Sequence, residues 1–378
     1  MATTHSHGTV GDSRLYVALE LGEKSWTVAL TSGFGQAVCV RTIAARDLRA
    51  LERLVGEARA LFGLGAAARV ESCYEAGRDG FWVHRAVTGM GLHNRVVESS
   101  SIAVDRRARR TKTDGLDARK LLMMLLRVCA GEAHVWREVR VPTAAAEAAR
   151  HRSRERGTLV AEHTRLCNQI GSWLATYGGV VAGRRQQAAQ WWTEVRDWQG
   201  ERLPAEVQAR LARTVARRAV VLAQIAELDA LQQAAVADAP PDTPLRRLTQ
   251  LRGVATTSAS SLLAEGLVWR GFRNRREVGG YLGFAPAPYQ SGTNVHDQGI
   301  TRAGNARLQA VSLQLAWNWV RWQPHSALTH WYLARFGEGR RARRIGIVAL
   351  ARKLLIALWR YATTGVPPAG ACLKPLAA

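Results

Sequence analysis

The sequence lacks the long apolar runs and paired cysteines that mark several common protein classes. No stretch of its 378 residues approaches the ~20 consecutive apolar residues that a membrane-spanning helix needs. The first twelve residues have neither a basic start nor an apolar run, so no secretory signal is expected. The five cysteines are scattered and form no CxxC pair, which argues against zinc fingers and a disulfide framework. These absences predict a cytoplasmic protein with reduced thiols and no membrane partner.

Acidic residues are few compared with basic ones. The chain has 30 Asp and Glu against 53 Lys and Arg, which gives a net charge of +23 and a pI near 11.1. Residues 1–100 are almost neutral, with 11 basic and 10 acidic residues, so nearly all of the excess lies beyond them. Because such an excess attracts polyanions, the sequence predicts a nucleic-acid-binding protein. We expect this protein to be cytoplasmic, nucleoid-associated and of bacterial or archaeal type.

The first 140 residues are predicted to form an α/β domain. After a disordered tail at 1–13, alternating apolar residues indicate strands and helical apolar spacing indicates helices. The strands are expected at 15–21, 26–31, 36–43, 69–74 and 95–98, and the helices at 46–62, 80–88 and 116–128. The order βββαβαβ is typical of a ribonuclease-H-like fold, which we assign to residues 14–140.

The rest of the chain is predicted to be all-α. Residues 141–240 have an imperfect 3–4 apolar spacing, which indicates a helical hairpin or a dimerising coiled coil. The Pro-rich segment 239–244 is the clearest linker, and it precedes a mostly helical C-terminal domain at 241–378. Within that domain, helices are expected at 305–322 and 341–361, and an irregular loop at 284–304.

Four carboxylates of the first domain are candidate metal ligands. Glu20 lies within an apolar strand, Glu75 ends another strand, and Asp114 and Asp117 share one face at the start of a helix. In a ribonuclease-H-like fold such positions converge, and oxygen-rich sites suit Mg²⁺ or Mn²⁺. Two alternatives stay open: Asp114 and Asp117 could cap a helix, and Glu75 could be a turn residue.

Ser291 is the candidate nucleophile. It belongs to GFAPAPYQSGTNVHDQGITRAGN, residues 283–305, where Pro286 and Pro288 stiffen the approach and cationic residues and Asn305 follow. A serine that attacks a DNA phosphate must be exposed and surrounded by positive charge. Because Ser-Gly is also a common turn dipeptide, a structural role for Ser291 stays open.

Basic runs and one glycine turn are candidate nucleic-acid contacts. Leu248–Glu265 resembles a helix-hairpin-helix with Gly253 in its turn, although Ala255 stands where a second glycine is usual. Basic runs suit contacts to the phosphate backbone, or could be solvated helix faces. The candidate contacts are Arg106, Arg107, Arg109, Arg110, Lys112, Arg302, Asn305, Arg340, Arg341, Arg343 and Arg344. Trp317, Trp319 and Trp322 are predicted to be core residues rather than base-stacking platforms.

These motifs together resemble one known family. The matching segments are YVALELGEKSW, CYEAGRDG, VDRRARRTKTDGLDARKLL, LRGVATTSASSLLAE, YLGFAPAPYQSGTNVHDQGITRAGNARL and ARKLLIALW. In this order they resemble the DEDD-type insertion-sequence transposases, which are bridge-RNA-guided serine recombinases. That family combines a Holliday-junction-resolvase-like N-terminal domain, a coiled coil and a C-terminal domain with a catalytic serine.

The resemblance implies specific roles. Ser291 falls on the family's nucleophile, and Glu75, Asp114 and Asp117 fall on the second to fourth positions of the acidic quartet that holds Mg²⁺. Glu20 falls where the family usually has aspartate. The implied partners are DNA (element ends and target), a structured guide RNA, and further copies of the chain in a dimer or tetramer.

Two other functions stay open at this point. A hydrolytic nuclease or junction resolvase would use the carboxylates alone and form no covalent adduct. A catalytically inactive remnant would bind nucleic acid without chemistry, and Glu20 in place of aspartate is the feature that keeps this alternative open.

Overall fold

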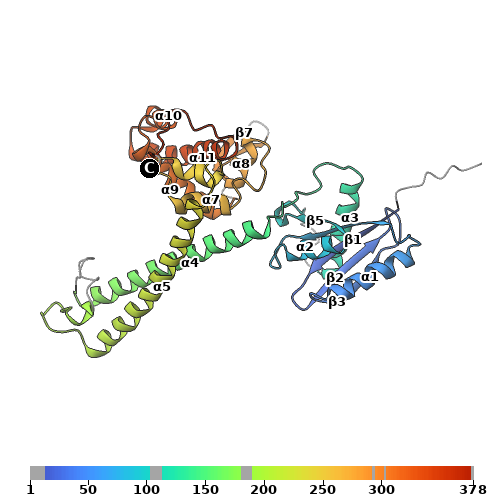
Figure 1. The fold of residues 1–378 in the computed structure, drawn as a ribbon, viewed down its shortest axis with the longest axis horizontal. Coiled ribbons are helices and arrows are strands. Elements are labelled where there is room, and N and C mark those ends of the chain that lie inside the picture. Colours follow the sequence, from blue (N-terminus) through green and yellow to red (C-terminus); the bar gives the residue numbers. More distant parts are fainter. Residues whose placement is uncertain (1–12, 103–112, 180–189, 292–293, 302–303, 376–378) are drawn as a thin grey trace, which may run out of the picture. The chain divides into compact units, whose positions relative to one another are not determined.

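The computed structural model describes residues 13–102, 113–179, 190–291, 294–301 and 304–375. Two compact units divide the chain at Pro142 and Thr143. Unit 1 is α/β and unit 2 is mostly helical, so the mixed composition predicted from the sequence is confirmed at this level (Figure 1). Residues 1–12 of the predicted tail (1–13) and the whole basic run at 105–112 lie outside the described residues.

A five-stranded sheet forms the centre of unit 1. The strand order is β3-β2-β1-β4-β5; β1, β2 and β3 are antiparallel, and β4 and β5 run parallel to β1. The strands are β1 (Arg14–Leu21), β2 (Ser25–Thr31), β3 (Cys39–Ala44), β4 (Arg69–Glu75) and β5 (His93–Val97). All five predicted strands and their order along the chain are therefore confirmed.

Helices cover both faces of this sheet. Leu15, Val17 and Leu19 of β1 pack into one core with α1 (Leu48–Leu61) and α2 (Trp82–Gly89). The residues between them, Tyr16 and Ala18, face the other way and pack with α3 (Asp114–Cys129). This alternation follows from the two-residue period of a strand, and it assigns each β1 side chain to a face.

Unit 2 begins with two long paired helices. α4 (Ala144–Thr176) and α5 (Ala205–Ala237) lie side by side and share a small core that includes Ile170, Leu174 and Leu211 (Figure 1). A bidentate ion pair also joins them, with Arg156 nitrogens 2.6 and 3.0 Å from the Asp229 oxygens. Of the described helices, α5 alone is long and apolar enough to cross a membrane by length and composition, which is weak evidence for a span.

The remainder of unit 2 is a helical body built around one long helix. α11 supplies Leu350, Leu354 and Leu358 to a single core shared by the other helices. The helices are α6 (Pro244–Gln250), α7 (Thr256–Ala264), α8 (Arg275–Leu282), α9 (Ala306–Trp322), α10 (Ala327–Phe336) and α11 (Arg340–Thr364). α11 packs against α6, α8, α9 and α10, so it holds the body together.

The prediction of an irregular loop at 284–304 is wrong in one respect, because most of this segment forms a β-hairpin. β6 (Pro286–Ser291) pairs antiparallel with β7 (Asn294–Ile300). The register is irregular between Pro286 and Pro288, which is where prolines leave gaps in the ladder of hydrogen bonds. The hairpin joins α8 to α9 and carries Ser291 at its far end.

Candidate active-site residues

Glu20 and Glu75 end neighbouring parallel strands. Leu19 of β1 is paired with Tyr74 of β4, so the next residues, Glu20 and Glu75, lie side by side at the carboxyl edge of the sheet. Both are half-buried. Glu20 continues the face of Tyr16 and Ala18, and Glu75 continues that of Cys73, which also packs with α3. The strands therefore present both carboxylates on the face that α3 covers.

The direction of α3 brings its first turn to the same edge. Leu121 lies over the middle of the sheet, where its carbonyl oxygen is 3.8 Å from Cys73 Sγ. Cys129, at the helix end, lies near the start of β1: burial first, and then the nearby Cys129 thiol, raise the pKa of Tyr16. α3 thus runs antiparallel to β1 and β4. One turn before Leu121, about 6 Å back along the axis, Asp117 reaches the level of Glu20 and Glu75.

Asp114 lies almost one turn further out. It is exposed, whereas Asp117 is half-buried. The alternative that these aspartates cap the helix is wrong, because Thr113 is the N-cap and its hydroxyl accepts a 3.4 Å hydrogen bond from the Leu116 amide. Both aspartates remain in the first turn, where the helix dipole favours negative charge.

The ends of β1 and β4 and the first turn of α3 carry the four carboxylates, and we call this region the carboxylate edge (Glu20, Glu75, Asp114 and Asp117). Carboxylate oxygen is the donor that Mg²⁺ and Mn²⁺ prefer, so the chemistry of the donors fits these ions. In the part of the chain that the structure describes, no three His, Cys, Asp or Glu side chains are close enough to hold one ion. The backbone thus brings three of the four positions to one level, but the side chains do not form a coordination shell.

Ser291 occupies the last residue of β6. It pairs with Asn294 of β7, and this pair closes the hairpin. The two residues between them, 292 and 293, lie outside the described residues. The backbone of Ser291 is therefore at the tip of the hairpin, as far along the ladder from the helical body as β6 extends.

Two glycines fix the base of this hairpin. Gly283 ends α8 in a left-handed conformation with φ +74°, and a Cβ added there would lie 2.8 Å from the Gly304 nitrogen. A Cβ at Gly304 would overlap the Gly283 backbone even more closely. Thr301 adds a 3.0 Å hydrogen bond from its amide to the Ala285 carbonyl. Because the two chain segments touch backbone to backbone, only glycine fits at 304 without movement.

Asn305 belongs to a buried polar network beside the hairpin. Its side-chain oxygen caps α9 by accepting from the Arg307 and Leu308 amides, both at 3.1 Å. Its side-chain nitrogen lies 2.9 Å from a Glu265 oxygen and 3.0 Å from the Tyr281 hydroxyl. These contacts are all inside the protein, so the sequence-based role of Asn305 as a nucleic-acid contact stays a prediction.

Glu265 is the centre of this network. It is buried, and Arg154 of α4 binds it through two hydrogen bonds of 2.9 and 3.0 Å. Burial alone would raise the pKa of Glu265, but the hydrogen bonds from Arg154 and Asn305 outweigh it and lower the pKa. Glu265 is therefore an ionised carboxylate that ties α4, α7 and the start of α9 together.

The other predicted nucleic-acid contacts fall into two groups. Gly253 adopts φ +81° between α6 and α7, and a Cβ there would lie 3.2 Å from Trp322 Cβ, so glycine is required for packing. The first turn of α11 contains four exposed arginines and no acidic residue: Arg340, Arg341, Arg343 and Arg344. Arg106, Arg107, Arg109, Arg110, Lys112 and Arg302 lie outside the described residues.

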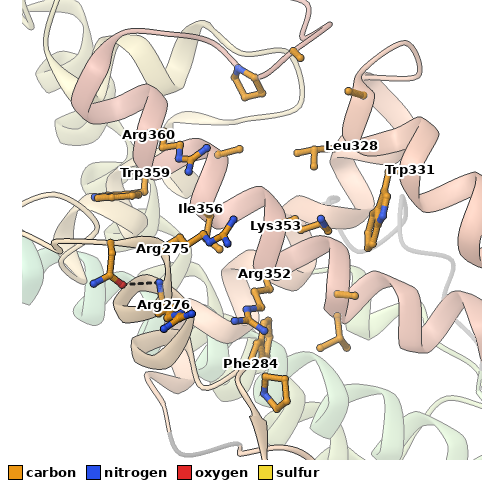
Figure 2. A pocket seen from close by; sticks show the side chains of 18 of the residues that line it. Arg275, Arg276, Phe284, Leu328, Trp331, Arg352, Lys353, Ile356, Trp359 and Arg360 are labelled. Carbon is orange, nitrogen blue, oxygen red and sulfur yellow. Dashed lines mark hydrogen bonds between the residues drawn. The ribbon is translucent and has the colours of Figure 1, made fainter.

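A basic groove in unit 2 was missed by the sequence analysis. Figure 2 shows Arg275 and Arg276 of α8 on one side and Arg352, Lys353 and Arg360 of α11 along it. Arg275 and Arg276 belong to a short basic run with Arg273, but these cations of α11 form no run and recur only at helical spacing. Periodic cations on the exposed face of a helix could have indicated it.

Comparisons with known proteins place the chain among transposases. A family model described as the IS116/IS110/IS902 transposase family matches residues 245–330, which include α6 to α9 and the Ser291 hairpin. "Putative transposase y4rJ" of Sinorhizobium fredii (strain NBRC 101917 / NGR234) is 38% identical over 378 residues, which cover 95% of this chain and 94% of that protein.

Two further relatives are more distant. "Putative transposase y4qE" of the same strain is 26% identical over a match that covers 77% of this chain and 74% of that protein. "Probable family 20 transposase" of Pseudomonas aeruginosa PAO1 is 29% identical over a match that covers 59% of this chain and 65% of that protein. The chain belongs to the IS116/IS110/IS902 family of insertion-sequence transposases.

Proposed function

We propose that this transposase breaks and rejoins DNA through Ser291, and that the carboxylate edge holds the Mg²⁺ or Mn²⁺ ions that assist the reaction. The observation that carries the proposal is the position of Ser291 at the closing pair of the β6–β7 hairpin, inside the segment matched by the family model. The tip of a hairpin is a backbone position that a polymer as wide as DNA can approach, as the segment that carries a nucleophile requires.

The proposed reaction is a transesterification. The Ser291 oxygen attacks a DNA phosphate, a phosphorus–oxygen bond to the neighbouring sugar breaks, and that sugar hydroxyl leaves with a proton. The serine gives up one proton and the sugar takes up one, so atoms and charge balance. Attack of a different sugar hydroxyl on the serine–phosphate ester reverses the step and joins a new strand, with no ATP consumed.

The carboxylate edge supports a metal role in this proposal. The strand register and the direction of α3 bring Glu20, Glu75 and Asp117 to one level of one face. A bound Mg²⁺ would neutralise charge that develops on the phosphate. Together with strands β1–β5 in the order 3-2-1-4-5, this edge also supports the ribonuclease-H-like assignment of unit 1.

Guide RNA and self-association complete the proposal. The described residues of unit 2 offer cations rather than a base-reading helix motif, which fits a protein whose target is selected by a paired RNA. Exchange of strands between two duplexes needs more than one nucleophile, so a dimer or tetramer is proposed. The long α4–α5 pair, whose α5 surface is largely exposed, is the proposed contact between copies.

A labelled-adduct assay tests the nucleophile. Purified protein, its RNA, Mg²⁺ and end-labelled element-junction DNA are incubated and run on a denaturing protein gel. We expect a labelled band that disappears in Ser291→Ala and persists in the matched control Ser258→Ala, a serine of α7. Free cleavage products without any adduct would instead indicate hydrolysis by the carboxylate edge.

A further inference from the structure

The basic groove lies on the exposed face of α11. It is a cavity of about 1860 Å³ between α10, the start of α8 and the base of the β6–β7 hairpin. Its lining follows α11 from Arg344 to Thr364, which is about 30 Å at the rise of an α-helix. Pro286, Gly299 and Ile300 of the hairpin base also line it. The groove is therefore continuous with the element that carries Ser291.

The charge of the groove has a single sign. Seven cationic side chains line it and no carboxylate does: Arg273, Arg275, Arg276, Arg344, Arg352, Lys353 and Arg360. Within the described residues none of the seven forms an ion pair with an acidic side chain. So many unneutralised cations in one concave surface create a field that favours a polyanion.

One of these cations is held in place by a glycine. A Cβ added to Gly279 of α8 would lie 3.0 Å from Arg352 Nε, so the missing side chain leaves room for this half-buried guanidinium. Arg275, Arg276, Lys353 and Arg360 are exposed at the groove surface. The groove thus combines one half-buried guanidinium with several exposed cations, which can contact phosphates along a strand.

Aromatic and apolar side chains lie among the cations. Trp331 of α10, Trp359 of α11 and Phe284 line the groove together with aliphatic residues such as Ile356 (Figure 2). The Lys353 ammonium lies 4.5 Å from the centre of the Trp331 ring, a cation–π geometry. Duplex DNA presents its charged backbone outward and offers few exposed ring faces. An unpaired strand presents bases as well as phosphates, and bases stack on aromatic side chains.

We propose that this groove binds unpaired single-stranded DNA beside the strand that Ser291 attacks. The proposal rests on the proposed function for its choice of DNA, because the base of the Ser291 hairpin lines the groove. Cations bind the phosphates, and Trp331 and Trp359 stack on bases without reading their sequence. The groove holds a strand opened from its duplex while the hairpin reaches the phosphate.

Binding by the full-length chain tests the groove separately from catalysis. The protein carries Ser291→Ala in every sample, so no adduct forms, and fluorescence anisotropy follows labelled DNA of about 16 nucleotides, the upper site size of one small domain. The groove variant is Arg275→Ser, Arg276→Ser and Arg360→Ser. The control removes the same charge outside the groove with Arg49→Ser, Arg53→Ser and Arg335→Ser, all exposed.

The expected results are a preference and a change of salt slope. The parent should bind single-stranded DNA about 10-fold or more tightly than a duplex of the same sequence, from stacking. Loss of three phosphate contacts should reduce the slope of log affinity against log salt by about 2. Equal slopes in the groove and control variants, or a preference for duplex, would overturn the proposal. Much tighter binding of RNA than DNA would overturn the choice of DNA.

Photo-crosslinking gives a readout that needs no groove variant. Single-stranded DNA with bromouracil is crosslinked to the same full-length protein, and the modified peptides are identified by mass spectrometry. We expect crosslinks on peptides that contain Trp331 or Trp359, and crosslinks confined to other peptides would contradict the proposal. Crosslinks to the groove peptides, together with no Ser291 adduct in the labelled-adduct assay, would support the groove and contradict the proposed serine chemistry.

Discussion

At the scale of single residues, the position of Asp117 links secondary structure to metal chemistry. Glu20 and Glu75 are fixed by strand register, whereas Asp117 reaches them only because α3 runs antiparallel to β1. Their oxygens are donors of the kind that Mg²⁺ and Mn²⁺ bind. In the proposed metal site, the extra methylene of Glu20 makes this side chain longer than an aspartate, and its carboxylate could still ligate an ion.

Asp117→Asn is expected to weaken metal binding. The amide keeps the size of the side chain but removes its charge, so Mn²⁺ affinity should fall about 10-fold or more. Electron paramagnetic resonance of Mn²⁺ titrated into the full-length protein measures this directly. Glu57→Gln, an exposed residue of α1 away from the edge, is the control and should bind like the parent. Unchanged Mn²⁺ binding in Asp117→Asn would contradict the metal role.

Gly304 shows how one missing side chain shapes the candidate site. Gly304→Ala would push a methyl group against the Gly283 backbone, which cannot move as a flexible side chain can. We expect a loss of about 1–3 kcal/mol in the free energy of unfolding, typical of overpacking, and weaker adduct formation.

Urea unfolding and the labelled-DNA assay measure these two effects. Gly280→Ala is the control, because a Cβ on this α8 glycine meets nothing within 4 Å and alanine favours a helix. A Gly304→Ala protein as stable and as active as Gly280→Ala would contradict this prediction, because it would show that Gly283 and Gly304 can move apart without effect.

At the scale of elements, a buried ion pair connects the long helices to the hairpin region. Arg154 of α4 holds Glu265 at the end of α7, and Glu265 holds Asn305, which caps α9. α8 and the hairpin are the segments between α7 and α9. The network therefore sets the positions of α7 and α9, the helices before and after the segment that contains α8 and the Ser291 hairpin.

Arg154→Met is expected to destabilise unit 2 in a pH-dependent way. Fully buried pairs lose ~3–5 kcal/mol when one partner is removed, and the partial exposure of Arg154 reduces this to about 1–3 kcal/mol. Because Glu265 has a lowered pKa, its contribution is present above the unfolded Glu pKa of about 4.3 and is lost as pH falls through the folded pKa.

Urea unfolding at neutral and acidic pH measures this contribution. The parent should lose its advantage over Arg154→Met as the pH falls. Arg165→Met removes only an exposed pair with Glu162 on the same helix and should change stability by less than about 0.5 kcal/mol. A difference between parent and Arg154→Met that does not depend on pH would refute the role of the Glu265 charge.

The elements that sequence patterns predicted well are those with regular apolar spacing. β1 and β2 bury runs of mostly apolar residues, and α1 has a buried apolar stripe, so these patterns are visible in the sequence. The β6–β7 hairpin was missed because PAPYQS contains two prolines and neither PAPYQS nor NVHDQGI shows a regular apolar alternation. Its formation depends on the contact between Gly283 and Gly304, which is non-local.

The exposure of two tryptophans and the helix that lines the basic groove were not predicted from the sequence. Trp319 is buried as predicted, but Trp317 and Trp322 are 49% and 52% exposed, so the core assignment is wrong for these two. The α10 helix was not predicted, and it contributes Trp331 to the basic groove. Grooves depend on which helices pack together, and local patterns do not contain that information.

At the scale of the whole molecule, most of the excess positive charge lies in unit 2. The sequence places almost all of its excess positive charge beyond residue 100. The structure gathers many of these cations in unit 2, in the basic groove and the first turn of α11. Arg344 belongs to both groups. The four arginines at the start of α11 interact unfavourably with the positive end of the helix dipole. An anion bound there would be stabilised both by the arginines and by the dipole.

Family membership gives this arrangement its biological setting. The similarity to y4rJ extends over 95% of the chain, so both units are shared with that relative and not only the matched segment at 245–330. The proposed serine chemistry requires unit 2 for the nucleophile and unit 1 for the metal. Either unit alone would not be expected to exchange strands.

Mass-spectrometric mapping of the covalent adduct tests the central claim most directly. The full-length protein reacts with its RNA, Mg²⁺ and junction DNA, and nuclease and protease then reduce the adduct to a peptide with one attached nucleotide. The account predicts a phosphodiester on Ser291, in the peptide that spans β6 and β7. A nucleotide attached to any other residue, or cleaved DNA with no attached peptide, would contradict it.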